Sequence, residues 1–504
     1  MKATATWSME CTNLIQRVMN RLGDSPGGIA GFESALGELC SYVTGAAGGS
    51  SAVEVENEAI TAGLRIVRPL LEVRLQEALD KADLGLAGEA ACRRCAGTLQ
   101  SQGRRSRSWA SLSGRLTLTR RYSHCAKCEE GRAPGQDALG LTESSFTPRL
   151  EEVVTLAATT VAHAKAKDLI GRMLGVDVSV KAVEQMVERR AQEVSTQLTA
   201  DALACAPYDE TGLPVATQAR PADAVKAAPK RVYLEMDGVV PMTRELLGPN
   251  ELSPADRRRQ KAALRDGARG GRGRRYRLVG REVKNAVLYR AEDCREESAG
   301  RSAIGAKKYV SHLGDWRQFA ALLWVEMLRQ GFDRAEEIVV ISDGAAWIRE
   351  LCTWLPVKVT LILDLFHVKH RIWEVANLLH GEHSADARAW AETQGERIEA
   401  GRADAVRQAL RFAKPRGYNA REAVRLLIEY LASNEDRMKY PEYRRRGLRV
   451  GSGAVESANY HVTGARLKLQ GMRWSEQGAR DMAYLRADLF NGNWEARTRA
   501  LRTA

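Results

Sequence analysis

Apolar side chains recur with a helical period through the first part of the chain. Between residues 60 and 79 they stand three or four positions apart among charged residues, which is the spacing of an amphipathic helix. Pro69 falls inside this stretch, and because proline has no amide hydrogen to donate, a kink or a helix start is expected there. Residues 1–90 are therefore predicted to form an N-terminal helical region, to which the pattern assigns no chemistry.

The pattern changes from helical to alternating after residue 90. Between 106 and 122, apolar and polar residues alternate, as they do on the two faces of a β-ribbon. Tight cysteine pairs stand at both ends of this segment. Residues 91–140 are therefore predicted to form a small module of their own.

A helical pattern returns in 141–200, where the stretches 166–174 and 179–190 flank a Gly-Val-Asp-Val turn. Ser179 is a residue type that caps helix N-termini. We interpret this region as a helix-turn-helix with its second helix facing DNA, while any helical hairpin gives the same pattern. The basic residues of the second helix are Lys181, Arg189 and Arg190.

Short apolar strands alternate with helices in the second half of the chain. Residues 201–230 before them are rich in alanine and proline, a composition typical of a linker. One amphipathic helix, 316–329, separates the third and fourth strands, and this alternation predicts an α/β domain within a multidomain protein. The predicted strands are 231–236, 282–289, 309–313, 337–341 and 357–363.

Two helical segments follow the last of these strands. The block 368–450 has a mainly helical pattern, and 455–469 is predicted to form one more helix. The strands therefore end well before the chain does.

A positive charge surplus indicates the kind of partner. The 504 residues include 76 lysines and arginines against 63 acidic residues, a net charge of +13. Such a surplus favours a polyanion, because each phosphate that is neutralised releases condensed counterions. The segment 251–281 contains ten arginines and three acids and is expected to be a flexible cationic insert that contacts phosphate. Its candidate residues are Arg257, Arg258, Arg259, Arg274 and Arg275.

Neither a membrane span nor a signal peptide is expected. No apolar run approaches the roughly 20 residues needed to cross a bilayer, and residues 1–17 lack the apolar core of a signal peptide. The protein is therefore predicted to be cytoplasmic, to associate with the nucleoid when bound to DNA, and to have no membrane partner.

Four of the nine cysteines form two Cys-x-x-Cys pairs, separated by 29 residues. Matched pairs at this spacing fit a structural Zn²⁺ with four sulfur ligands, and such a metal would fold a ribbon too short to bury a core of its own. A redox role is the alternative. The predicted zinc ligands are Cys92, Cys95, Cys125 and Cys128.

Three acidic residues stand at informative places along the α/β region. Asp237 ends the first strand, Asp343 follows the fourth, and glycine follows each of them. Glu456 lies after Gly-Ser-Gly in the first turn of a late helix. A single Asp-Gly is usually a turn, but in the ribonuclease-H layout the first and fourth strands are neighbours, so that acids at their ends converge.

Three converging carboxylates repel one another unless hard cations lie between them, and oxygen ligands suit Mg²⁺ or Mn²⁺. Two such ions about 4 Å apart activate a water or a sugar hydroxyl and stabilise the leaving oxygen of a phosphodiester. Asp237, Asp343 and Glu456 are therefore the predicted catalytic metal ligands. Asp364 also ends an apolar strand and competes with Asp343, which is preferred because it follows the helix 316–329 and has its own Asp-Gly turn.

Seven short motifs follow one another in the second half of the chain. They are Met236-Asp-Gly238, Arg281-Glu-Val-Lys284, Ser342-Asp-Gly-Ala-Ala-Trp-Ile348, Asp364-Leu-Phe-His367, Arg437-Met-Lys-Tyr-Pro-Glu442, Gly451-Ser-Gly-Ala-Val-Glu-Ser457 and Gly471-Met-Arg-Trp-Ser475. Each is weak alone, but in this order they resemble the ISKra-type insertion-sequence transposases, a bacterial group related to the Mutator-like DDE enzymes. The likeness covers roughly residues 90–495, including the paired cysteines.

This resemblance implies a fold and roles for particular residues. The expected fold is a ribonuclease-H-like catalytic domain made of 231–367 and 451–504 and interrupted by the all-helical insertion 368–450. Helical and zinc-ribbon DNA-binding modules precede it. Asp364 and His367 match the Asp-x-x-His signature of Mutator-like enzymes and are implied to position the site or contact substrate, since residues three apart share a helix face.

The glutamate helix and the loop after it supply further candidates for contacts with DNA near the metals. Trp474 in that loop suits stacking on a frayed end base, with core packing as the alternative. The arginine run 444–446 is expected to face phosphate. The candidates are Arg444, Arg445, Arg446, Asn459, Arg466, Lys468, Arg473 and Trp474.

These expectations describe a DNA transposase that binds the ends of its insertion sequence and cuts and joins strands with a DDE triad. Its DNA partners would be terminal repeats and a target, and the resemblance implies a homodimer or higher oligomer, because two ends must be held together. One alternative is an inactive, domesticated DNA-binding descendant, against which the presence of all three acids argues. Another is a ribonuclease-H-type nuclease for RNA–DNA hybrids, which the zinc module and the helical insertion disfavour.

Overall fold

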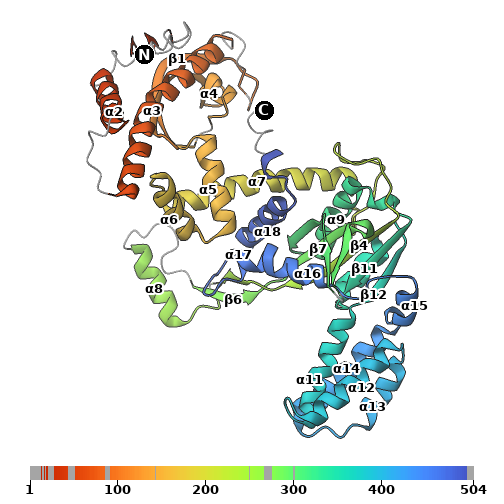
Figure 1. The fold of residues 1–504 in the computed structure, drawn as a ribbon. Coiled ribbons are helices and arrows are strands. Elements are labelled where there is room, and N and C mark those ends of the chain that lie inside the picture. Colours follow the sequence, from red (N-terminus) through yellow and green to blue (C-terminus); the bar gives the residue numbers. More distant parts are fainter. Residues whose placement is uncertain are drawn as a thin grey trace, which may run out of the picture. The chain divides into compact units, whose positions relative to one another are not determined.

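The computed structural model describes residues 28–43, 51–85, 91–141 apart from 93, 144–248, 250–265, 275–298 and 301–496, with isolated positions between 13 and 20. The chain divides into two compact units, Met1–Val187 with Glu495–Ala504, and Glu188–Trp494. Figure 1 labels the helices and strands of both. Among the described helices, none combines the length and the apolar character that crossing a membrane requires.

Helices open the first unit, and the prediction of a helical N-terminal region is confirmed for its described part. They are α2 (Gly28–Val43) and α3 (Ala52–Gly85). Helix α3 runs through Pro69, so the chain does not start a helix at that residue. Val73 and Leu79 beyond the proline are buried, and their packing offsets the one hydrogen bond that proline cannot make.

The predicted ribbon is confirmed as part of an antiparallel three-stranded sheet, β1-β2-β3. Its strands are β1 (Leu99–Ser111), β2 (Gly114–Cys125) and β3 (Glu130–Arg132), and the short helix α4 (Pro134–Ala138) follows. One face of the sheet packs against α3. The buried apolar cluster there consists of Leu79, Trp109, Leu118 and Leu141, a small core for a module of this length.

Helix α3 also lies along the edge of β2. Three of its polar side chains accept hydrogen bonds of 2.7 to 3.0 Å from alternate backbone amides of β2. Four helical residues advance about 6 Å and two strand residues about 6.6 Å, so the two spacings nearly match between the first two contacts, whereas the third contact comes seven residues further along the helix. The pairs are Glu72 with Thr117, Gln76 with Thr119, and Asp83 with Arg121.

The region interpreted as a helix-turn-helix contains α5 (Pro148–Thr160), α6 (His163–Leu174) and α7 (Val180–Cys205). Gly175 ends α6 with a φ of 65°, a left-handed cap that favours glycine. Ser179 Oγ accepts the amide of Ala182 at 3.1 Å, so the predicted turn and cap are confirmed. The second helix is longer than predicted, because it continues past Arg190 to Cys205.

A five-stranded sheet with the order β10-β7-β4-β11-β12 forms the centre of the second unit. The strands are β4 (Arg231–Val239), β7 (Val283–Arg290), β10 (Lys308–Leu313), β11 (Glu337–Ser342) and β12 (Val359–Leu363). Neighbours β10, β7 and β4 are antiparallel, whereas β4, β11 and β12 are parallel. All five predicted strands are present, and the first and fourth of them are neighbours.

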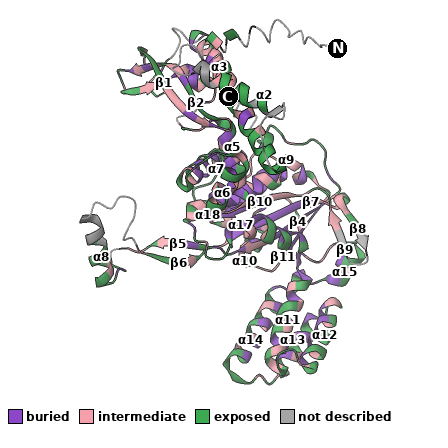
Figure 2. Ribbon diagram, turned by 60° about the vertical axis from the view of Figure 1, so that its left-hand side comes forward, coloured by how far each residue is buried: buried purple, intermediate pink, exposed green. Residues whose placement is uncertain are grey.

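Helices cover both faces of this sheet, which explains why its strands are almost continuously apolar. Alternate residues of β4 point to opposite faces. Val232, Leu234 and Met236 pack against α9 (Trp316–Gln330) and α10 (Ala346–Trp354). Tyr233 packs on the other face, in a second cluster with the helices that follow β12. Figure 2 shows β4, β7 and β11 as buried strands in the middle of the unit.

The predicted linker 201–230 is attached to the second unit. Its first residues belong to α7, and Ala206 is fully buried. Arg220 Nη2 lies 2.5 Å from Asp333 Oδ2, and the amide of Val225 donates to Arg329 O at 2.9 Å. Its contacts with the end of α9 therefore hold it against the sheet, which alanine and proline content alone does not reveal.

The described parts of the cationic insert, 251–265 and 275–281, form regular elements where a flexible loop was predicted. They belong to an arm formed by β5 (Met242–Leu246), α8 (Pro254–Arg265) and β6 (Tyr276–Gly280), which Figure 2 shows reaching away from the sheet. Ser253 Oγ accepts the amide of Asp256 at 3.1 Å, and this cap together with arginines of good helix propensity forms a helix instead of a flexible loop.

The predicted helical insertion is confirmed. Its helices are α11 (Leu365–His380), α12 (Ala385–Glu399), α13 (Ala403–Phe412), α14 (Gly417–Ser433) and α15 (Tyr440–Arg445). Figure 1 shows α11 to α14 gathered as a bundle beyond β12. Their apolar residues continue the cluster of Tyr233, so the insertion shares a core with the sheet. A small hairpin of β8 (Cys294–Ser298) and β9 (Arg301–Ile304) lies earlier, between β7 and β10.

The last segment is not the single helix predicted for 455–469. It comprises α16 (Gly453–Ala458), the π-helical η4 (Asn459–Gly464), α17 (Ala465–Leu467) and α18 (Glu476–Phe490). A π-helical turn inserts an extra residue into the helix and is frequent at functional sites. It changes which side chains share a face with Glu456.

Candidate active site and metal centres

Two of the predicted acids lie side by side at one edge of the sheet. Strands β4 and β11 are parallel, and Met236 is paired with Ser342. The next residues, Asp237 and Asp343, therefore lie at the same level of the sheet. Asp343 directly follows β11, whereas Asp237 does not end its strand as predicted, because β4 continues to Val239. Acids that are 106 positions apart in sequence are thus adjacent in the fold.

Burial and the charge of Asp343 both disfavour ionisation of Asp237. Burial is the larger cause, and together they raise the pKa of Asp237 to about 6. Asn459 Nδ2 donates a hydrogen bond to Asp237 Oδ2 at 2.5 Å and fixes its orientation. Two neighbouring carboxylates of this kind gain from a cation between them, and their oxygens are the donors that Mg²⁺ and Mn²⁺ prefer.

The turn after β11 fixes Asp343. Asp343 Oδ1 accepts the amide of Ala345 at 2.9 Å, as in an Asx-type turn. Gly344 has a φ of 95°, and a Cβ there would lie 2.8 Å from Leu363 Cδ1, so only glycine fits. Tyr430 of the helical insertion donates its hydroxyl to the carbonyl of Asp343 at 2.8 Å. The insertion therefore helps to hold the second acid.

Glu456 lies in the first turn of α16, and its side chain is 54% exposed. A buried glutamate on β4, Glu235, holds this helix. Glu235 Oε2 accepts the amides of Ala454 and Val455 at 2.7 and 3.0 Å, and Tyr289 donates its hydroxyl to Oε1 at 2.5 Å. Glu235 and Asp237 are two residues apart on β4 and therefore point to the same face of the sheet. Through its hydrogen bonds to α16, Glu235 holds the helix of Glu456 on that face.

The sequence analysis missed Glu235, although a signal was present. It is the only acidic residue between Arg231 and Met236, in a strand that is otherwise apolar. A fully buried carboxylate is costly unless it is hydrogen-bonded. The position of Glu235 two residues before Asp237 could therefore have marked it.

Asp364 and His367 lie on one face at the start of α11, as the spacing predicts. His367 Nδ1 is 3.3 Å from Asp364 Oδ2 and 3.8 Å from Glu456 Oε1. One ligand atom from each of these three residues lies within 4.8 Å of the others. The hydrogen bond to Asp364 raises the pKa of His367.

The oxygens of Asp364 are already occupied. Asp364 is fully buried, and one oxygen accepts the amides of Phe366 and His367, at 2.7 and 3.4 Å. The other accepts the amide of Ser452 at 3.0 Å, the Ser452 hydroxyl, and the His367 ring. Burial tends to raise the pKa of Asp364, but hydrogen bonds from His367 and Ser452 hold it below its usual value. Asp364 therefore caps α11 and holds the ring of His367. The group of three close ligand atoms contains Asp364 and does not contain Asp343, so Asp343 as the second metal ligand stays a prediction.

A second residue that the sequence analysis missed is Asn285 on β7, which pairs with Asp237 in the sheet register. Asn285 Nδ2 donates to Asn459 Oδ1 at 2.7 Å. Its own oxygen accepts the hydroxyls of Ser311 and Thr463 at 2.6 and 2.9 Å. Asn459, predicted to contact DNA, donates its side-chain amide to Asp237, and buried Asn285 joins it and Thr463 of the π-helical turn to β7.

Three predicted DNA contacts are buried, and these predictions are corrected. Arg466 is 1% exposed and lies 4.8 Å from the ring of Trp474, which itself donates Nε1 to Leu467 O at 3.1 Å. Arg190 lies 5.1 Å from the ring of Trp494 and is 9% exposed. Stacking on an indole lets a guanidinium enter a core, so these side chains pack inside the protein and do not face DNA.

The remaining basic candidates divide into two groups. Some form ion pairs with the chain's own acids: Lys181 with Glu184, Arg275 with Asp256, Arg444 with Glu399, and Arg446 with Glu337. Others are exposed side chains: Arg189, Arg257, Arg258, Arg259, Arg445, Lys468 and Arg473. Arg274 lies outside the described residues.

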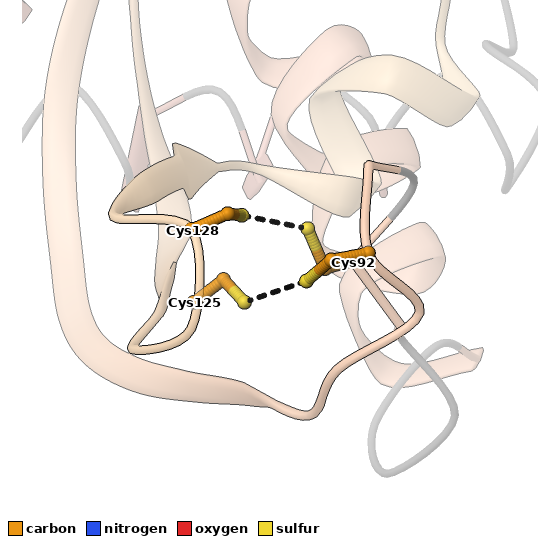
Figure 3. A group of neighbouring side chains, drawn as sticks. Cys92, Cys125 and Cys128 are labelled. Atoms are coloured by element: carbon orange, nitrogen blue, oxygen red, sulfur yellow. Dashed lines mark hydrogen bonds between the residues drawn. The ribbon is translucent and has the colours of Figure 1, made fainter.

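The four predicted zinc ligands come together in the first unit, and Figure 3 shows Cys92, Cys125 and Cys128 among them. Cys92 Sγ is 3.3 Å from Cys128 Sγ, and Cys95 Sγ is 3.5 Å from Cys125 Sγ. All four sulfurs lie within 4.8 Å of one another, a separation that suits tetrahedral coordination at about 2.3 Å per bond.

Both cysteine pairs have the same backbone turn. The amide of the residue after each pair donates to the carbonyl of its first cysteine, at 2.7 Å for Ala96 and 2.8 Å for Glu129. These two residues have φ values of 54° and 57°, a conformation that is uncommon outside glycine. Two independent turns that adopt the same rare geometry around four sulfurs indicate a common ligand.

The sulfur contacts favour metal over redox chemistry. The closest sulfur pairs join different Cys-x-x-Cys motifs, whereas a redox motif reacts within one pair. Four sulfurs at these separations are the donor set of a structural zinc site, so the residues present fit this metal.

Comparisons with known proteins concern the second half of the chain. The model of UPF0236, an uncharacterised protein family, matches residues 276–502. This part of the chain is therefore similar to that family. The matched residues include Asp343, Asp364, His367 and Glu456, whereas Asp237 precedes them.

Two UPF0236 proteins of Caldanaerobacter subterraneus subsp. tengcongensis are each 25% identical to the chain, over 217 and 232 residues. The similarity covers 39% and 42% of this chain and 41% and 44% of those proteins. The chain thus matches less than half the length of these curated relatives. The name of the first relative joins eleven numbered designations, and a third relative's name joins four.

Proposed function

We propose that the protein is a DDE transposase of the ISKra type, with a ribonuclease-H-like catalytic domain that cleaves and rejoins DNA. The observation that carries this proposal is that Asp237, near the end of β4, and Asp343, directly after β11, lie at the same level of neighbouring parallel strands, with the helix of Glu456 attached to β4 through Glu235. A sheet of the order 3-2-1-4-5, counted along its five strands, supports the ribonuclease-H-like assignment.

Each residue has a definite part in the proposed chemistry. Asp237, Asp343 and Glu456 would hold two Mg²⁺ or Mn²⁺ ions. When bound, these supply activation of a water or 3′ hydroxyl and stabilisation of the leaving oxygen. Asn459 orients Asp237, and Glu235 anchors the helix that carries Glu456. His367, beside Glu456, is placed to donate a hydrogen bond to a phosphate oxygen of the substrate.

The names of the relatives agree with a mobile element. A protein that carries eleven designations in one organism is what repeated copying of one sequence would leave. The net charge of +13 and the exposed arginines of α8 suit long contacts with phosphate. The DNA partners we propose are the terminal repeats of an insertion sequence and a target duplex, bound by a homodimer or a higher oligomer.

The test is a cleavage and joining assay. Full-length protein with Mg²⁺ is mixed with labelled duplexes that carry the DNA flanking its gene on each side, beside an RNA–DNA hybrid of the same sequence. We expect nicks at defined positions at the ends of the element and joined products that need both Mg²⁺ and a target duplex. Asp237→Asn should abolish both, whereas Asp386→Asn, an exposed aspartate of the helical insertion, should cleave like the wild type.

Two results would contradict the proposal. A wild type that binds the flanking DNA without cutting or joining it would instead be a non-catalytic DNA-binding protein. Cleavage of the hybrid regardless of its sequence would indicate a ribonuclease-H-type nuclease.

A further inference from the structure

The ribbon of β1 and β2 has one buried and one outward face. The buried face contains Trp109, Leu116 and Leu118. On the outward face, Ser106 is paired with Thr119 and Ser108 with Thr117. Their hydroxyls form cross-strand hydrogen bonds of 3.1 and 2.8 Å, so a ladder of small polar side chains runs along this face.

Arginines stand at both ends of this ladder. Arg104 and Arg121 face each other across the strands on one side, and Arg115 lies on the other side, beside the turn. All three are exposed. We call these three arginines and the four hydroxyl residues the hydroxyl face.

The positive charges of the ribbon repel one another and destabilise it. Residues 99–125 include six arginines and no aspartate or glutamate. Two successive cross-strand pairs, Arg104 with Arg121 and Arg105 with Arg120, place like charges opposite each other, which destabilises a sheet. Two contacts reduce this repulsion: Asp80 of α3 pairs with Arg104, and the ring of Tyr122 lies 4.2 Å from the guanidinium of Arg105. Neither Asp80 nor Tyr122 belongs to the ladder of hydroxyl residues. Such an arrangement becomes favourable when an anion binds.

The shape of the hydroxyl face suits one polyanion in particular. A two-stranded antiparallel ribbon fits the major groove of B-form DNA, and side chains as small as serine and threonine let its backbone approach closely. The major groove of A-form RNA is too narrow for it. The arginines place positive charge at both ends of the ladder, where phosphates would border the groove.

We propose that the hydroxyl face is a major-groove DNA-binding surface, with Arg115 and Arg121 on phosphates and the serine and threonine ladder against base edges. This inference rests on the proposed function only for the identity of the DNA. The paired cysteines at the open end of the ribbon keep the two strands in register, because Leu99 is paired with Cys125.

The test measures how binding to DNA depends on salt. Full-length wild type and Arg115→Gln/Arg121→Gln are titrated with a fluorescent duplex at several salt concentrations. The matched control is Arg388→Gln/Arg416→Gln, which removes two exposed arginines of the helical insertion. Each lost phosphate contact should reduce the slope of log K against log salt by about 0.9, so the ribbon variant should lose about two and the control nothing. Zinc content and circular dichroism verify that the ribbon variant is folded.

A second variant tests the ladder itself. Ser108→Glu places a carboxylate in the middle of the face and should lower DNA affinity at least tenfold, whereas Ser108→Ala should change it little. An unchanged slope for the arginine variant, or equal binding of double-stranded RNA, overturns the inference.

These experiments distinguish a failure of this inference from a failure of the proposed function. A wild type that cuts the element ends while the arginine variant binds DNA normally overturns only the hydroxyl face. A wild type that cuts nothing, with binding that depends on Arg115 and Arg121, overturns only the transposase.

Discussion

The cysteine centre and the acidic centre are built in opposite ways. The four cysteines fall within 37 consecutive residues, on two copies of one turn, and the core beside them is small. The acids come from two strands and a helix, around a sheet whose two faces each carry a large apolar cluster. We infer that the ribbon would depend on bound metal for its folding. The sheet would fold without metal and hold the carboxylates in place.

Removing metal should show this contrast most strongly. Chelation of zinc should unfold the ribbon, because structural zinc contributes on the order of 10 kcal/mol in small zinc modules, and the second unit should remain folded. Hydrogen exchange followed by mass spectrometry would show loss of protection in 91–132 and none in β4 or β11. Chelation of Mg²⁺ serves as the control and should leave both regions protected. Equal loss in both units would contradict the comparison.

The next largest effect concerns the two rival aspartates. Asp343→Asn should reduce strand cleavage by at least about a thousandfold, because it removes a metal ligand, with little change in the free energy of unfolding. Asp364→Asn should instead destabilise the sheet unit by about 1 to 3 kcal/mol, because buried donors lose a charged acceptor. Urea unfolding and cleavage assays on both variants would decide between them. The reverse pattern would make Asp364 the metal ligand.

Glu235 offers a finer test of how the sheet positions its site. Glu235→Ala should weaken Mn²⁺ binding, measured by electron paramagnetic resonance, about tenfold to a hundredfold, as losses of residues that support metal ligands do. DNA binding should not change, because Glu235 is fully buried. Tyr289→Phe removes only one of its hydrogen-bond donors and should have a smaller effect. Normal Mn²⁺ affinity in a folded Glu235→Ala would show that α16 needs no such anchor.

The smallest predicted effect is a dependence of stability on pH in the sheet unit. Burial, and then the nearby charge of Arg480, lower the pKa of His312 from 6.5 to about 4. Its ring contacts the hydroxyl of Tyr484 and the side chain of Gln318, and Lys284 and Asp315 are the other charged groups that influence it.

Because the folded pKa of His312 lies below the unfolded one, the unfolded state takes up a proton first as pH falls. Between pH 7.5 and 5 this linkage should remove about 2 kcal/mol of stability. Urea unfolding of the wild type at the two pH values should show this loss of stability. The loss should be smaller in His312→Gln and unchanged in His370→Gln, which alters an exposed histidine. An identical loss in His312→Gln would assign the pH dependence to other groups.

The strands, the helical insertion and the cysteine cluster could be predicted from sequence because each depends on local pattern or spacing. Side-chain environments could not. Arg466 and Arg190 have the same charge as exposed arginines, and only the tertiary fold places an indole beside each of them. Asp364 and Asp343 both follow apolar strands, and the hydrogen bonds from Ser452 that distinguish them come from a loop 88 residues away.

The π-helical turn was also beyond prediction. It is fixed by the contact of Thr463 with Asn285 across the sheet, not by the helix propensity of 459–464. Glu235 had a visible signal, as a lone acid in an apolar strand, but its role depends on which helix lies over it.

The hydrogen bonds from the backbone amides of β2 to side chains of α3 affect how copies of this protein interact in a crowded cell. A bare strand edge recruits strands from other molecules, and β2 would expose one between Thr117 and Arg121. Three of these amides donate hydrogen bonds to side chains of α3, as they would to the carbonyls of a neighbouring strand, but a helix has no free strand edge. The accepting residues are Glu72, Gln76 and Asp83. The helix thus ends the sheet and protects a basic ribbon from intermolecular β-pairing.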